Sequence, residues 1–232
     1  MTFFEPRTGD LERLGGTVPP GSRELSVWAI PLRWDDGRAI ELLNPHQRGF
    51  SAVGKLHWLR QGWLPVASLK HAFAFIDQDG NEVATESRVA VELVTGQQIG
   101  VPPSERPLKL VPRTSCNILP RWSPDEIAAE IETDWMKLLS ADTPEAIDGF
   151  KKNLAARGVP PFAETLTVAA ESPFLMPVYI GLVDTAAGEE VQVIDGITIN
   201  LHPHLSFLLT DHLDELKNEF LGGRRVRGVD ET

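Results

Sequence analysis

Apolar and polar residues alternate with a period of two through much of the first half of the chain. Glu24–Trp34 places large apolar side chains at every second position, which predicts a half-buried strand. The Asp-Asp-Gly sequence at 35–37 predicts a turn, and Arg38–Leu43 a returning strand. A second hairpin is expected from Val66–Asp77 and Glu82–Val94, joined by a turn at 77–81.

The pattern changes to helical spacing after residue 122. Ser123 followed by proline and then Glu126 forms a capping box, which predicts the start of a helix. A second helix is expected from Thr143 to the glycine at position 158, so that the two form a helical pair over about 123–157. Three acids on the first helix, Glu126, Glu130 and Asp134, recur every four residues and are expected to form a solvated stripe.

Strand signals return at residue 165. Candidate strands are Leu166–Ala170, Pro177–Asp184, and a third hairpin from Glu190–Ile194 and Ile197–Leu209. Asp211 is expected to cap a C-terminal helix. The chain therefore predicts an α+β fold: an antiparallel β-sheet built from hairpins, with the helical pair and the C-terminal helix packed on it.

The domain organisation follows from glycine and proline. Residues 1–23 are expected to be an irregular N-terminal arm, 24–221 a single α+β domain, and 222–232 a flexible tail. The proline-rich stretch 100–121 rules out a long regular element and is the place where two subdomains would meet, if there are two.

Charge and composition exclude several classes of partner. The net charge is −11 and the isoelectric point about 5.0, which argues against general binding of nucleic acid or of anionic lipid. The one basic cluster, at positions 224–227, is expected to be a solvated end. A single cysteine allows no internal disulfide, and neither a signal peptide nor a membrane-spanning stretch is recognisable, so the cytoplasm is the expected location.

One segment offers metal ligands. If 197–209 is a strand, His202 and His204 project from its polar face, one pleat repeat apart, and neutral imidazoles so placed can bind one Zn²⁺ ion or a related metal. Asp211 and His212 would complete the ligand set. The competing interpretation is the solvent-facing side of an edge strand, where a proline such as that at position 203 belongs.

Tryptophans supply the other candidate surface. Trp58 and Trp63 flank Arg60 in a region that looks like a loop, and exposed indole rings beside arginine are typical anchors for a protein partner. Ordinary partial burial is the alternative. Trp28, Trp34 and Trp135 are expected on core faces, and His71, between apolar neighbours, is expected to be a core histidine with satisfied hydrogen bonds.

Two hypotheses for function follow. The first is a non-catalytic protein without a cofactor that works through protein–protein contacts, as a structural, adaptor or inhibitory partner. It rests on the acidic composition, the loop tryptophans and the lack of nucleotide-binding or nucleophile motifs. The alternative is a metal-dependent hydrolase whose zinc or similar ion at His202 and His204 acidifies a bound water.

Overall fold

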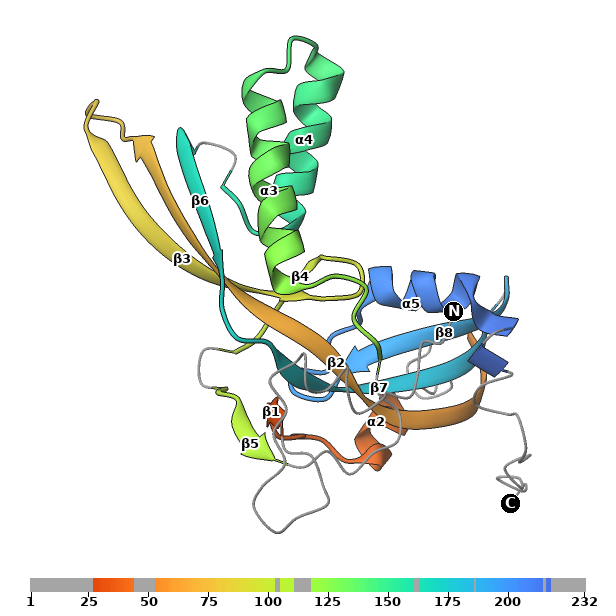
Figure 1. Ribbon diagram of the computed structural model, residues 1–232. Coiled ribbons are helices and arrows are strands. Elements are labelled where there is room, and N and C mark those ends of the chain that lie inside the picture. Colours follow the sequence, from red (N-terminus) through yellow and green to blue (C-terminus); the bar gives the residue numbers. More distant parts are fainter. Residues whose placement is uncertain are drawn as a thin grey trace, which may run out of the picture.

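One very long strand, β2, organises the sheet of this protein. The computed structural model describes residues 27–43, 53–102, 105–110, 118–160, 163–185, 187–214 and 216–217. β2 spans Val53–Ile76, 24 residues, where an average strand has about five or six. One edge of β2 pairs with β7 (Phe174–Thr185) and β6 (Thr165–Ala170), and the other edge pairs with β3 (Glu82–Glu92). All three pairings are antiparallel, and Figure 1 shows the strongly twisted ribbon that results.

Shorter strands extend this sheet on both sides. β8 (Gly188–Asp195) pairs antiparallel with β7, and β4 (Gln98–Ile99) with β3. β1 (Val27–Ala29) makes a single parallel pairing with β7 and an antiparallel one with β5 (Leu108–Leu110). Together with the helices described below, this mostly antiparallel sheet confirms the predicted α+β class.

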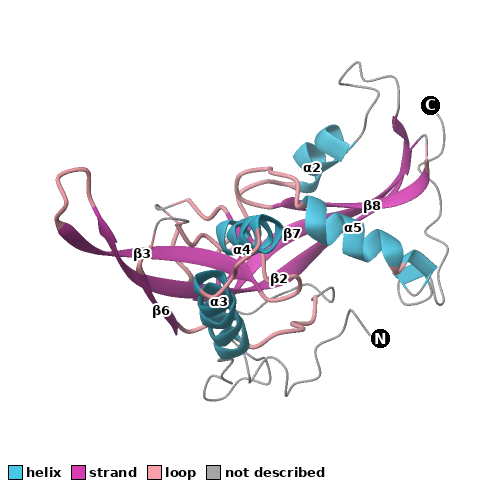
Figure 2. Cartoon of the chain, turned by 90° about the horizontal axis from the view of Figure 1, so that it is seen from above, coloured by secondary structure: helices cyan, strands magenta, loops and turns pink. Residues whose placement is uncertain are grey.

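Helices cover the two faces of the sheet at different places. Even-numbered residues of β2, such as Leu64 and Val66, share a core with α5 (Pro203–Asp211). Odd-numbered residues such as Leu69 share another core with α3 (Pro124–Leu139) and α4 (Pro144–Ala156). α2 (Asp36–Leu43) packs against Tyr179 in a third, smaller core. Figures 1 and 2 show α3 beside α4 near β6, and α5 running along β8.

The helical pair forms as its sequence predicts. The Ser123 hydroxyl accepts from the amide of Glu126, and the Glu126 carboxylate accepts from the amide of Ser123 at 2.7 Å, which completes the capping box. Thr143 caps α4 by its hydroxyl alone, which accepts from the amide of Ala146. Gly158 follows α4 with φ +78°, a conformation that favours glycine at a helix end.

The first predicted hairpin is wrong in its second half. Residues 36–43 form α2 rather than a strand, because Asp35 acts as a helix cap: its carboxylate accepts from the amide of Arg38 at 2.9 Å. The predicted core positions of Trp28 and Trp34 are also wrong, since these side chains are 43% and 41% exposed. Val27 and its neighbours at 29 and 30 take the buried positions instead.

The second hairpin is confirmed, although its first strand is much longer than predicted. β3 pairs with β2 along its full length, and Asp77 closes the turn by accepting from the amides of Asp79 and Asn81. The expected arm 1–23 and tail 222–232 lie outside the described residues. None of the helices in the described residues combines the length and the apolar composition that a membrane span requires.

Candidate functional site

The segment that carries the two histidines is a turn and a helix, not the predicted strand. Asp195, at the end of β8, has a side chain whose oxygens accept from the amide of Ile197 at 2.8 Å and from the amide of Asn200 at 2.9 Å. The carboxylate also accepts from the amides and the hydroxyl of the residues between them. These bonds hold residues 196–200 in a tight turn, and Pro203 then occupies the first position of α5.

A second turn with the same hydrogen-bonding pattern follows strand β3. The carboxylate of Glu92 accepts from the amide of Val94 at 2.7 Å, and from those of Thr95 and Gln97. In both turns the amide of the acidic residue donates to the carbonyl five positions later, that of Gln97 or that of Asn200. Glu92 and Asp195 are each only 2% exposed, so two buried carboxylates organise two neighbouring loops.

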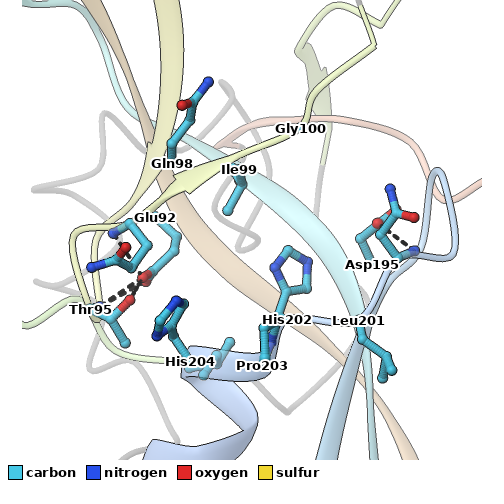
Figure 3. A pocket seen from close by; sticks show the side chains of 13 residues that line it. Glu92, Thr95, Gln98, Ile99, Gly100, Asp195, Leu201, His202, Pro203 and His204 are labelled. Atoms are coloured by element: carbon cyan, nitrogen blue, oxygen red, sulfur yellow. Dashed lines mark hydrogen bonds between the residues drawn. The ribbon is translucent and has the colours of Figure 1, made fainter. Parts of the chain in front are cut away.

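A cavity of about 230 Å³ lies between these turns and the beginning of α5. Figure 3 shows the rings of His202 and His204 between the Glu92 turn on one side and the Asp195 turn on the other. The remaining lining residues come from the β3–β4 connection, from β4 and the glycine after it, and from the start of α5 and the residues before it: Thr95, Gln97, Gln98, Ile99, Gly100, Asn200, Leu201, Pro203 and Leu205.

His202 has the most unusual environment in this cavity. It is the residue before α5, and its amide donates to the carbonyl of Val193 on β8 at 2.8 Å. Its Nε2 atom is buried and has no hydrogen-bond partner among the described residues. Burial lowers the pKa of His202 below its ordinary value of 6.5, and the negative charges of Asp195 and Glu92 partly oppose this shift. The imidazole is therefore neutral at pH 7.

The predicted metal ligands are divided between the two ends of α5. His202 and the exposed His204 lie at the start of the helix, whereas Asp211 is its last residue and His212 follows it. Nine helical residues separate the ends by about 12 Å. In the described part of the chain, the only three-residue group with metal-ligand atoms within 4.8 Å of one another lies elsewhere, at His57, Asp184 and Glu189. The structure thus does not bring the four predicted ligands together.

The proposed tryptophan anchors are in a strand, not in a loop. Trp58, Arg60 and Trp63 are all part of β2 and pair with residues of β7. Trp63 is only 5% exposed and belongs to the core beside α3, while Trp58 packs against the core on the opposite face. Arg60 is exposed. The two indoles therefore do not form one exposed surface.

The expected solvated stripe of acids is not solvated throughout. Glu126 serves as a cap of its own helix, and Asp134 is only 6% exposed. Arg157, which follows α4, lies 3.1 Å from Glu130 and 3.7 Å from Asp134. These contacts join α3 to the end of α4, so two of the three acids hold the helical pair together.

Neither Glu92 nor Asp195 is predicted from the sequence to organise a site. Asp195-Gly196 was expected to be a simple hairpin turn, and Glu92 a strand residue. An acid at the end of an apolar strand, followed by threonine and glycine within four residues, is a local signal for both turns. That the two turns lie side by side follows only from the pairing of the strands.

Comparisons of this chain with protein-family models, with curated proteins and with solved structures find no match. The geometry of the molecule is therefore the basis for its proposed function.

Proposed function

We propose that the protein is non-catalytic and acts through contacts with a protein partner, and that the cavity at the start of α5 receives one basic side chain of that partner. The observation that carries this proposal is the buried Nε2 atom of His202, which has no hydrogen-bond partner among the described residues. A buried polar atom without a partner costs about 1–3 kcal/mol, so an incoming donor at this atom would be favoured.

The size of the cavity favours a single side chain over a small-molecule ligand. Pockets for drug-sized ligands usually measure about 300–1,000 Å³. This cavity, at about 230 Å³, is smaller, and its lining combines apolar surface with a few convergent polar groups. One long side chain that enters from a partner's surface matches these dimensions.

The charge of the cavity favours a cation. The neutral imidazole of His202 can present Nε2 as an acceptor to an ammonium or guanidinium donor, while Asp195 and Glu92 supply negative potential nearby. The net charge of −11 adds long-range attraction for a basic partner. The hydrolase alternative has less support, because its four predicted metal ligands do not converge.

The proposal is tested with the smallest basic probes. Long-range ¹H–¹⁵N spectra of the imidazole nitrogens are recorded during titration with Nα-acetyl-lysine amide, with Nα-acetyl-arginine amide and with the neutral Nα-acetyl-norleucine amide. We expect the Nε2 signal of His202 to move with either basic probe and to stay in place with the neutral one, because only a cation meets the negative potential of the cavity.

Two variants locate the binding. His202→Ala should abolish the response of neighbouring backbone signals to the basic probes. Arg60→Ala, at the exposed position that the sequence suggested for partner contact, should leave the response unchanged. A His202 signal that ignores both basic probes, or that moves equally with the neutral probe, would overturn the proposal; thermal unfolding of each variant verifies that it is folded.

A further inference from the structure

A second group of side chains with metal-binding chemistry lies at the other end of β7, near the β7–β8 turn. His57, Asp184 and Glu189 each offer one ligand atom, and these atoms lie within 4.8 Å of one another. The three residues come from the neighbouring strands β2, β7 and β8. None of them belongs to the cavity at α5.

A β-bulge in β2 places His57 in this group. Leu56 pairs with Val183 and Trp58 with Leu182, so two steps along β2 correspond to one step along β7, and His57 is the extra residue. Leu56 packs on the α2 side of the sheet, and Trp58 packs on the α5 side. If the residues of β2 alternated strictly, His57 would lie on the same face as Leu59, toward α2. Because of the bulge, the His57 imidazole contacts Asp184 instead, and 2.8 Å separate Nε2 from Oδ1.

The two carboxylates are brought together by the register of β7 and β8. Asp184 and Glu189 are direct cross-strand partners, which places their β-carbons about 4.5–5.5 Å apart. Like charges at such a pair repel each other and destabilise the sheet unless a positive group lies between or beside them. Lys217, which follows α5, forms an ion pair with Glu189, and His57 contacts Asp184.

The group is accessible from solvent without being fully exposed. The side chains of His57, Asp184 and Glu189 are 35%, 43% and 38% exposed. An ion held by them would keep part of its coordination shell open to water, because three protein ligands leave at least one position of a tetrahedral ion free.

We propose that His57, Asp184 and Glu189 form a binding site for a divalent transition-metal ion of the Zn²⁺ class. One imidazole nitrogen and two carboxylate oxygens are ligands that suit Zn²⁺ and its neighbours. Ca²⁺ and Mg²⁺ prefer shells made of six or more oxygens, so the imidazole selects against both. The ion neutralises the repulsion between the cross-strand carboxylates and replaces Lys217 as the positive partner of Glu189.

The site is tested by isothermal titration of metal-free, tag-free protein with Zn²⁺, and by the visible spectrum of the Co²⁺-loaded protein. We expect binding of one ion per chain, and no binding of Mg²⁺ or Ca²⁺ at the same concentrations. His57→Ala, Asp184→Asn and Glu189→Gln should each weaken Zn²⁺ binding at least about tenfold. Even the loss of a residue that only hydrogen-bonds to a metal ligand lowers metal affinity by about that factor.

Two further variants make the assignment specific. Lys217→Met removes the cation that competes for Glu189 and should strengthen Zn²⁺ binding several-fold. His204→Ala removes an exposed histidine of the other site and should leave the affinity unchanged. Three results would each overturn the three-ligand site: a parent that does not bind Zn²⁺, a His57→Ala variant that still binds it, or a Lys217→Met variant with no higher affinity. Thermal melting of the metal-free variants at the parent's temperature excludes misfolding as the cause.

Discussion

At the scale of single residues, buried histidines are the most unusual feature of this protein. His71, on β2, is 0% exposed, and neither of its ring nitrogens makes a hydrogen bond within the described residues. Its burial was expected; the backbone of Gly158 interacts with the ring, although no hydrogen bond of ordinary geometry joins them. Burial lowers the pKa of His71 below its ordinary 6.5, and the nearby backbone of Gly158 opposes only part of that shift. The pKa of His202 is lowered for the same reason.

These shifts predict a loss of stability in mild acid. A histidine whose pKa is lower in the folded than in the unfolded protein binds its proton preferentially in the unfolded state. The stability that the neutral histidine contributes is fully present above the pKa of the unfolded protein, near 6.5. It is lost as the pH falls from there toward the lower pKa of the folded protein. One such group contributes up to about 1.4 kcal/mol per pH unit within that window.

The measurement is urea unfolding of the parent and of His71→Leu at about pH 7.5 and about pH 5.5, on either side of the ordinary histidine pKa. We expect the parent to lose more free energy of unfolding than the variant between the two values. Carboxylate contributions are common to both proteins and cancel in the comparison. An identical pH dependence in both would show that His71 does not titrate on unfolding.

At the scale of elements, two hydroxyl groups of α5 accept hydrogen bonds from the outer edge of β8. The amide of Val193 donates to Ser206 Oγ and that of Val191 donates to Thr210 Oγ1, each at 2.9 Å. Ser206 and Thr210 are four residues apart and therefore share one side of the helix. An edge strand normally leaves such amides open to pairing with another chain, and here the helix covers them.

Removing either hydroxyl should destabilise the protein. Ser206→Ala or Thr210→Val leaves a β8 amide without its acceptor, which costs about 1–3 kcal/mol where water cannot replace it. Ser140→Ala is the matched control, because that hydroxyl binds only carbonyls at the exposed end of α3 and should cost less than about 1 kcal/mol. The free energies of unfolding in urea give the comparison; equal costs at all three positions would contradict this role of α5.

At the scale of the whole molecule, β2 connects all three cores. Leu64 belongs to the core beneath α5, Leu69 to the core beneath α3 and α4, and Leu59 packs against the core beneath α2. If β2 lost its pairing at one end, the rest of the same strand would be disturbed, and with it the other cores to which β2 contributes. The three cores are therefore expected to depend on one another for stability.

The chain should therefore unfold in one cooperative step, as a single domain would and as two subdomains that meet at 100–121 would not. Far-UV circular dichroism and tryptophan fluorescence should give coincident urea transitions with one midpoint. Two separated transitions would instead indicate that the part of the sheet beneath α3 and α4 is stable independently of the part beneath α5.

Several elements follow from the sequence because short-range interactions decide them. The capping box of α3, the Thr143 cap of α4 and the glycine after α4 act within a few residues, and so do the bonds by which Asp77 closes the β2–β3 turn. These elements were predicted with nearly correct boundaries. The alternation of apolar and polar residues over 197–209 wrongly predicted a strand. The segment is a turn held by the Asp195 carboxylate, followed by a helix of nine residues, and so short a pattern fits either structure.

The α+β class, the helical pair, the β2–β3 hairpin and the acidic charge can be predicted from the sequence, because all of them depend on local patterns or on simple counts. Polar residues far apart in the sequence are brought together only by the tertiary structure. The cavity joins turns that begin at Glu92 and Asp195, 103 positions apart, and the proposed metal site joins His57 to Asp184, 127 positions apart. Such encounters depend on strand register and on one bulge, and a shift of a single residue would turn these side chains to the opposite face.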